Sequence, residues 1–223
     1  MSELFVVATP IGNLEDMTHR AVRMLKEADL IAAEDTRQTK KLLNHYDIKT
    51  PMTSYHKFNI KSKSGHIIET IKQGKKVALV SDSGMPGISD PGYELIRDAI
   101  AEGVRVTPVP GPSALIAALA ASGLPTDKFV FLGFLEKKAG KRRRSLRELA
   151  DFDGTIIIYE SPFRVVKCLQ DILAVLGERE VAAARELTKV YEEVVRGKVS
   201  EVIKRFEGKP PRGEFVLLVK GKD

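Results

Sequence analysis

The 223-residue sequence has almost no cysteine, no long apolar run and no recognisable targeting segment. The single cysteine, Cys168, excludes an internal disulfide and a metal cluster built from several cysteines of one chain. No apolar run approaches the ~18 residues that a membrane-spanning helix needs. The amino terminus shows neither a charged leader nor a small-residue cleavage site. We therefore expect an intracellular, cytoplasmic protein with no membrane partner.

Several well-known catalytic fingerprints are also missing. The sequence contains no G-x-G-x-x-G and no G-x-x-x-x-G-K-[ST], which disfavours a Rossmann dehydrogenase and a P-loop nucleotidase. None of the four histidines belongs to an H-E-x-x-H motif, which disfavours a zinc hydrolase. Ser113 lies outside any G-x-S-x-G elbow and is better explained as the cap of a helix.

What the sequence does contain is a regular alternation of apolar runs and helical patterns. With 43% hydrophobic residues the chain can bury a core. Strands followed by crossover helices imply an α/β fold with a largely parallel sheet. In the first half we expect strands at 3–9, 29–35, 75–82 and 104–110, and helices at 18–29, 37–46, 64–74, 93–103 and 113–123.

A segment rich in turn-forming residues, 123–129, separates this series from a second one. After it we expect strands at 129–135, 155–161, 180–186 and 213–221, and helices at 162–177 and 200–208. The sequence therefore predicts two α/β domains, 1–122 and 123–223.

Four loops rich in special backbone residues follow predicted strands, at 8–16, 81–92, 108–114 and 159–164. The loop 81–92, SDSGMPGISDPG, is much longer than the usual strand-to-helix connection of about 2–6 residues. Glycine lets a backbone approach a ligand, proline holds one conformation, and ligands of α/β sheets bind at the carboxyl ends of strands. Together these loops predict a preformed pocket.

Polar side chains also follow predicted strands. Glu34 and Asp35 stand beside Arg37, an arrangement that fits either a general base or a salt bridge. His56, in the stretch SYHKFN, fits either a functional or a structural histidine.

The net charge of +6 is concentrated in one place. Seven basic residues and no acidic one lie between positions 137 and 147, namely Lys137, Lys138, Lys141, Arg142, Arg143, Arg144 and Arg147. Such a block is either a solvated helix start or the footprint of a protein that binds a phosphate backbone.

These motifs together resemble a known family. VVATPIGNLEDMT, AEDTRQTKKLLNHY, SYHKFN, SDSGMPGISDPGYELI, PVPGPSALIAALAASGLPTDKFVFLGFL, YESPFR, ARELTKVYEE and GEFVLLV look like the ribosomal RNA small subunit methyltransferase I family. The resemblance runs from about residue 4 to residue 219. The family is similar to the tetrapyrrole methylases, which are class III S-adenosylmethionine-dependent methyltransferases.

The resemblance implies two α/β domains with the methyl donor, S-adenosylmethionine, bound in the cleft between them. It implies methyl transfer to the ribose 2′-oxygen of a cytidine in the decoding region of small-subunit (16S) rRNA. Partners would be the small ribosomal subunit and a second copy of the chain, as a homodimer. This chemistry requires no metal.

The resemblance also implies roles for individual residues. Met85 stands where tetrapyrrole methylases carry the aspartate of Gly-Asp-Pro, so that loop would contact the donor through backbone and shape. The residues expected to bind the donor are Pro10, Ile11, Ser83, Gly84, Met85, Pro86, Ile88, Ser113, Ala114, Glu160 and Leu187.

For the reaction itself, Glu34 is the leading candidate for the general base and Asp35 the next. Arg37 would steer a phosphate, and His56 would shuttle a proton or hold the nucleotide. Lys137, Lys138, Lys141, Arg142, Arg143, Arg144 and Arg164 would bind RNA, with Phe163 and Arg164 as a stacking surface.

Two other interpretations remain at this point. A tetrapyrrole methyltransferase would share the fold and the donor but not the acceptor. A non-enzymatic ribosome-assembly factor would share only the fold, and it would have no evident use for the crowded donor loops.

Overall fold

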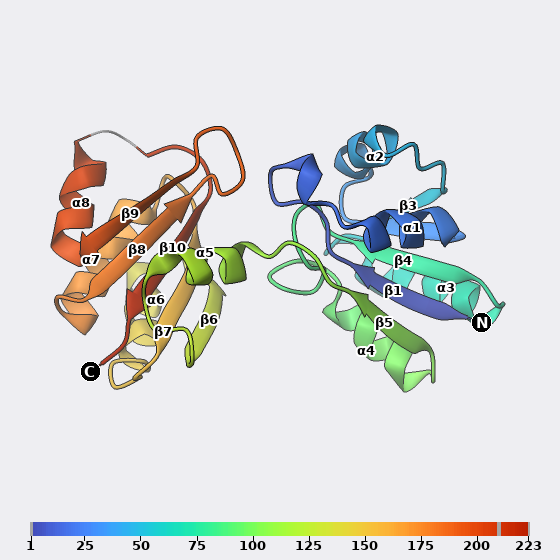
Figure 1. Cartoon of the computed structure of the whole chain (residues 1–223). Coiled ribbons are helices and arrows are strands. Elements are labelled where there is room, and N and C mark those ends of the chain that lie inside the picture. The colour runs from blue at the N-terminus through green and yellow to red at the C-terminus, as the bar shows by residue number, and fades with distance from the viewer. Residues whose placement is uncertain (1, 209–210, 223) are drawn as a thin grey trace. The chain divides into compact units, whose positions relative to one another are not determined.

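The protein is described here by a computed structural model, which describes residues 2–208 and 211–222. The chain folds as two compact units, unit 1 (Met1–Ser113) and unit 2 (Ala114–Asp223). Figure 1 shows that each unit is a sheet with helices packed on its faces. The predicted α/β class with two domains is therefore confirmed.

Unit 1 contains a five-stranded sheet in the order β3-β2-β4-β1-β5, in which every pair of neighbours is parallel. The connections are helical, as parallel pairing requires. Its elements are β1 (Glu3–Val7), the short 3-10 helix η1 (Leu14–Asp16), α1 (His19–Glu27), β2 (Leu30–Ala33), α2 (Thr36–His45), β3 (Met52–Ser54), α3 (Ile60–Lys72), β4 (Lys76–Val80), α4 (Tyr93–Ala101) and β5 (Arg105–Val109).

Both faces of this sheet are buried, which explains why its strands are continuous apolar runs. Because side chains alternate along a strand, neighbouring residues enter different cores. Ala78 and Val80 pack with α1 and α2, whereas Val77 and Leu79 pack with α3 and α4. All five carboxyl ends lie along one edge of the sheet, so the loops that follow the strands share that edge.

Unit 2 contains a mixed sheet in the order β6-β7-β10-β8-β9. Only β6 and β7 pair in parallel, whereas the other neighbours pair antiparallel. Its elements are α5 (Ala114–Ser122), β6 (Phe129–Phe134), α6 (Ala139–Arg147), β7 (Thr155–Glu160), α7 (Val165–Leu176), β8 (Glu180–Arg185), β9 (Glu193–Lys198), α8 (Val199–Glu207) and β10 (Phe215–Lys220).

Two strands were not predicted, β3 and β9. Each pairs with only one neighbour at an edge of its sheet, and none of the residues of either strand is fully buried. An edge strand that is only half-buried lacks the apolar run by which the central strands were recognised.

The boundary between the units differs from the predicted one. Helix α5 was assigned to the first domain, but its buried face packs on the sheet of unit 2. Leu115 and Leu119 meet Ile157, Val216 and Leu218 there. Helices α6, α7 and α8 cover the other face, so without α5 one apolar face of the unit 2 sheet would lie open.

Candidate active site

The loops rich in glycine and proline follow β1, β4 and β5, which are adjacent in the unit 1 sheet. Hydrogen bonds join the first two of these loops directly. The Thr9 and Gly84 backbones form an isolated two-bond bridge with N···O distances of 2.9 and 3.0 Å. The Thr9 hydroxyl donates to the Ser81 carbonyl at 3.1 Å. The loops are thus held in one arrangement without any ligand.

The third loop lies against the other two. A Cβ atom placed on Gly84 would lie 3.7 Å from the Ile11 side chain and 3.8 Å from the Pro112 carbonyl. On Gly111 it would lie only 2.9 Å from the Ala8 Cβ, which leaves no room for a side chain. Close approach therefore explains this glycine of the third loop.

The unusual length and composition of 81–92 have a local explanation as well. Gly84 has φ +81° and Gly92 has φ +151°, backbone conformations that side chains disfavour. A Cβ on Gly92 would lie 2.9 Å from the Gly87 nitrogen, because the loop folds back on itself just before α4 begins. The glycines are thus needed for the loop to fold back compactly on itself.

The predicted donor-binding residues of unit 1 gather on these three loops. Pro10, Ile11, Gly84 and Pro86 are buried and form the packed base of the loops. The more accessible ones are Ser83, Met85, Ile88 and Ser113.

A group of carboxylates lies beside these loops, where β2 and β4 end. The Asp82 amide donates to Glu34 Oε2 at 3.4 Å, and the Asp35 amide donates to Asp82 Oδ1 at 3.1 Å. Asp90, further along the same loop, interacts electrostatically with Glu34 and Asp82 and with the Ser81 hydroxyl. We call Glu34, Asp82 and Asp90 the carboxylate cluster.

Burial raises the pKa of Asp90 to about 6, and the charges of Glu34 and Asp82 add to this effect. Burial likewise raises the pKa of Glu34, where the Asp82 amide and His56 act in the opposite direction. Carboxyl groups with raised pKa values are poised to accept a proton near neutral pH.

Asp90 was missed by the sequence reasoning, although it lies in the very loop that was singled out. The signal was the second aspartate of SDSGMPGISDPG, in a segment whose glycines and prolines predicted a compact fold. What was not visible was its burial next to Glu34, since these residues are far apart in the sequence.

Asp35 lies at the start of α2 and is paired with Arg37. Its side chain caps α2 by accepting from the Arg37 amide at 2.8 Å. The Arg37 guanidinium binds both carboxylate oxygens, at 3.0 and 2.7 Å, and these hydrogen bonds lower the pKa of Asp35 to about 2. Such a carboxylate is a poorer proton acceptor than Glu34, and the role of Asp35 as a base stays a prediction. Arg37 is held in this pair, although its side chain is 87% exposed.

His56 lies next to the carboxylate cluster, close enough to act electrostatically on Glu34. Its Nε2 is 3.4 Å from the side-chain nitrogen Nδ2 of Asn59. Its Nδ1 is buried and has no hydrogen-bond partner among the described residues. A buried ring nitrogen without a partner is uncommon and is compatible with a bound substrate group.

Three predicted donor-binding residues lie in unit 2, namely Glu160, Leu187 and Ala114. The Glu160 side chain is fully buried and pairs with Arg164, whose Nε donates at 2.8 Å. One of its carboxylate oxygens has no partner in the described part of the chain. Leu187 is half-buried and packs against the core beneath α5. Both assignments stay predictions, as does that of Ala114 at the start of α5.

The basic block consists of Lys137 and Lys138 followed by helix α6, and its cations are not equivalent. The Arg142 side chain is only 5% exposed, donates from Nε to Asp171 Oδ2 at 2.7 Å, and also binds the carbonyls of Glu136 and Lys137. Arg143 donates to the other oxygen of Asp171 at 2.6 Å. Arg142 therefore anchors α6 to α7, and its role in RNA binding stays a prediction.

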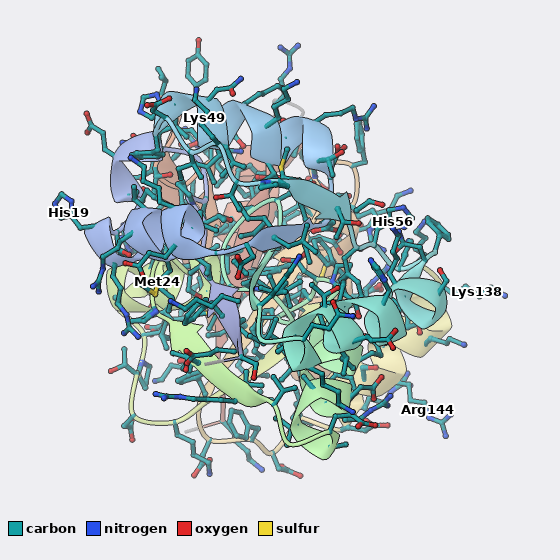
Figure 2. All side chains as sticks on the ribbon, turned by 90° about the vertical axis from the view of Figure 1, so that its right-hand side faces the viewer. His19, Met24, Lys49, His56, Lys138 and Arg144 are labelled. Carbon is teal, nitrogen blue, oxygen red and sulfur yellow. The ribbon has the colours of Figure 1, made fainter. Side chains whose placement is uncertain are left out.

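Arg164 is likewise bound to other groups of unit 2. It pairs with Glu160, and it also donates to the Leu135 carbonyl at 3.3 Å. To turn toward an RNA it would have to leave a buried carboxylate, and its role in RNA binding stays a prediction. The exposed cations of the block that are free of this pairing are Lys137, Lys138, Lys141, Arg144 and Arg147. Arg143 is also exposed, but it pairs with Asp171. Figure 2 shows the Lys138 and Arg144 side chains extending away from the ribbon.

Within residues 2–208 and 211–222, no three or more histidine, cysteine, aspartate or glutamate side chains are grouped so that they could hold a metal ion. No helix in the same part of the chain is long and apolar enough to span a membrane.

The sequence profile of the family Tetrapyrrole (Corrin/Porphyrin) Methylases matches residues 3–203. This chain belongs to that family. Among curated relatives, the ribosomal RNA small subunit methyltransferase I of Thermotoga maritima is 52% identical over 224 residues that cover all of both chains. The protein of the same name from Halalkalibacterium halodurans is 54% identical over 98% of this chain and 75% of its own.

Solved structures agree on the fold of the tetrapyrrole methylase chain. Diphthine synthase superposes with a TM-score of 0.76 at 13% identity, covering 99% of this chain and 90% of its own. Uroporphyrin-III C-methyltransferase from Thermus thermophilus, in complex with S-adenosyl homocysteine, gives 0.68 at 20% identity over 97% and 96%. At such identities these structures establish the fold alone.

These findings confirm the predicted family, the fold class and the activity class. The chain is an S-adenosylmethionine-dependent methyltransferase, and its relatives at 50% identity and above are named for ribosomal RNA.

Proposed function

We propose that the chain transfers the methyl group of S-adenosylmethionine to the ribose 2′-oxygen of a cytidine in the decoding region of small-subunit rRNA. The observation that carries the proposal is the 52% identity over the whole of both chains to a ribosomal RNA small subunit methyltransferase I. Because the match covers the whole of both chains, every residue of the proposed site lies within the matched region.

The donor is proposed to bind on the three loops of unit 1. Gly84 and its neighbours fit this role because the Thr9–Gly84 bridge already holds the loops together and the exposed backbone around Ser83 is open to a ligand. Met85 cannot accept a hydrogen bond as an aspartate would, so shape and backbone groups would hold the donor. S-adenosylmethionine supplies an electrophilic methyl group on a sulfonium.

Glu34 is proposed to take the proton of the ribose hydroxyl, with Asp90 beside it to share the proton. A positioned base contributes typically about 10²–10⁴-fold to such a step. The remaining task of the protein is to hold the reacting atoms about 3–3.5 Å apart and to keep water out. His56, next to Glu34, is proposed to orient the nucleotide.

The exposed cations of α6 are proposed to contact the RNA backbone, since a compact cationic surface is typical of phosphate binding. Action in the cytoplasm on an assembled small subunit, and a homodimeric state, belong to the same proposal and follow from the family resemblance. Light scattering after size exclusion would decide the oligomeric state.

The test is methyl transfer from labelled S-adenosylmethionine to small ribosomal subunits purified from cells that lack this protein. Subunits from cells that contain it serve as the control, because their site is already methylated. Label at a decoding-region ribose in the first sample only is the expected result. Donor binding without label would indicate a different acceptor, such as a tetrapyrrole, and the absence of donor binding would favour an assembly factor.

A further inference from the structure

The loop after β3 exposes an aromatic side chain close to His56. Phe58 is 86% exposed, whereas most large apolar side chains of the described residues are buried. A phenylalanine ring in water carries no polar group that would explain its position on the surface. An exposed aromatic ring offers a face on which a base of unpaired RNA can stack.

The loop that carries Phe58 is held firmly by its own hydrogen bonds. The Asn59 side chain accepts from the His56 amide at 2.8 Å and donates to the Ser54 carbonyl and hydroxyl at 3.2 and 3.1 Å. The Asn59 amide donates to the His56 carbonyl at 2.8 Å. Phe58 is therefore displayed from a braced turn, which lowers the entropy lost when a ligand binds it.

The surroundings of the ring are suited to a nucleotide. The Lys57 ammonium lies 5.0 Å from the ring centroid, and the His56 ring lies 6.0 Å away in an edge orientation. His56 in turn lies next to Glu34. A stacking face, a cation for phosphate and a proton acceptor thus belong to neighbouring residues of unit 1.

We propose that Phe58 stacks on a base of the acceptor RNA, at or next to the target nucleotide, with Lys57 contacting the adjoining phosphate. The ribose of that nucleotide then faces His56 and Glu34. This inference rests on the proposed function and assigns the part of unit 1 that holds the acceptor. Recognition of unpaired RNA generally combines stacking on aromatic rings with phosphate contacts.

Phe163 of unit 2 is the natural competitor, because it is 91% exposed and was predicted to stack together with Arg164. Its neighbouring cation is not available, since Arg164 is bound to the buried Glu160. Phe58 has the exposed Lys57 beside it, whereas the arginine that follows Phe163 is already paired with Glu160.

The experiment compares wild type with the variants Phe58→Ala, Phe58→Leu, Phe58→Tyr and Phe163→Ala. Equilibrium binding to unmethylated small subunits and methyl-transfer kinetics are both measured, along with the Kd for S-adenosylmethionine. Stacking is worth about 1–3 kcal/mol per base, so Phe58→Ala should weaken RNA binding about 5- to 150-fold. Phe58→Leu should weaken it similarly, while Phe58→Tyr and Phe163→Ala should stay within about threefold. The Kd for the donor should not change.

Unchanged RNA binding and turnover in Phe58→Ala would overturn the inference, and so would a loss confined to Phe163→Ala. If wild type binds subunits but does not methylate them, the proposed function fails, while a binding loss in Phe58→Ala still supports stacking. If wild type does not bind subunits at all, both proposals fail.

Discussion

Four acidic side chains lie near the ends of β2 and β4, and their surroundings make them chemically different. Asp35 is paired with Arg37 and caps a helix, so its pKa falls to about 2. Asp90 is half-buried among like charges, and its pKa rises to about 6. A charged partner favours the ionised form, whereas burial and like charges favour the neutral form. Only the second environment yields a group that exchanges a proton near neutral pH.

Replacing Glu34 by Gln should lower turnover by about 10²–10⁴-fold and leave donor binding unchanged, because the variant keeps the shape but cannot accept a proton. Single-turnover methyl transfer and calorimetric donor binding measure the two effects separately. Asp35→Asn is the matched control, since asparagine also caps helices and turnover should then stay within about threefold. An unaltered rate in Glu34→Gln would exclude it as the base.

Asp90 also predicts a pH dependence of stability. Its folded-state pKa of about 6 exceeds the unfolded value of about 3.9, so its stabilising contribution is complete below about pH 4 and is lost as the pH rises through about 6. Asp90→Asn should therefore be more stable than wild type at about pH 8, by about 1–2 kcal/mol after allowance for solvent screening, and similar to it at about pH 4. Denaturant unfolding at the two pH values checks this, and equal differences at both would refute it.

At the scale of the element, α6 combines an anchor and a binding surface on one short helix. Asp171 of α7 holds the buried Arg142 and also pairs with the exposed Arg143, while Lys141, Arg144 and Arg147 face solvent. A charged residue at a buried position needs a partner, and here α7 supplies it. The arrangement of the basic block thus depends on Asp171 of α7.

The triple variant of Lys141, Arg144 and Arg147 to Ala should bind small subunits more weakly and reduce the slope of log K against log salt by about 2. The fold should be unaffected, because all three side chains are exposed. Salt titrations of subunit binding measure the slope. A slope equal to that of wild type would show that α6 makes no phosphate contacts.

Arg142→Ala should behave differently from these surface variants. Removing it leaves Asp171 without its most buried partner, and breaking such a pair costs about 3–5 kcal/mol. Thermal unfolding should therefore show a clear loss of stability in Arg142→Ala and almost none in Arg144→Ala. Equal melting temperatures for the two variants would contradict the anchoring role.

At the scale of the whole molecule, the two units use α/β elements in different ways. Unit 1 has an all-parallel sheet whose loops converge on one edge, while unit 2 has a mixed sheet covered by α5 on one face and by three helices on the other. The all-parallel arrangement places the glycine- and proline-rich loops and the carboxylate cluster side by side, although they come from different parts of the sequence.

The position of the boundary can be tested with fragments. A fragment of residues 114–223 should fold cooperatively, because it retains α5 over its sheet. A fragment of residues 123–223 exposes Ile157, Val216 and Leu218, and it should bind a hydrophobic dye or aggregate. Circular dichroism and dye fluorescence distinguish the two. Identical behaviour of both fragments would show that α5 is dispensable for unit 2.

Sequence alone determined the α/β class, most strands and helices, the existence of two domains and the family. These features are local, because hydrophobic period, turn residues and motifs lie within short stretches of chain. Tertiary structure decided which carboxylate has a raised pKa, which arginine is an anchor, and to which unit α5 belongs. Those outcomes depend on Glu34 meeting Asp90, Arg142 meeting Asp171 and Leu119 meeting Val216. Burial and pairing of residues so far apart in the sequence exist only once the chain has folded.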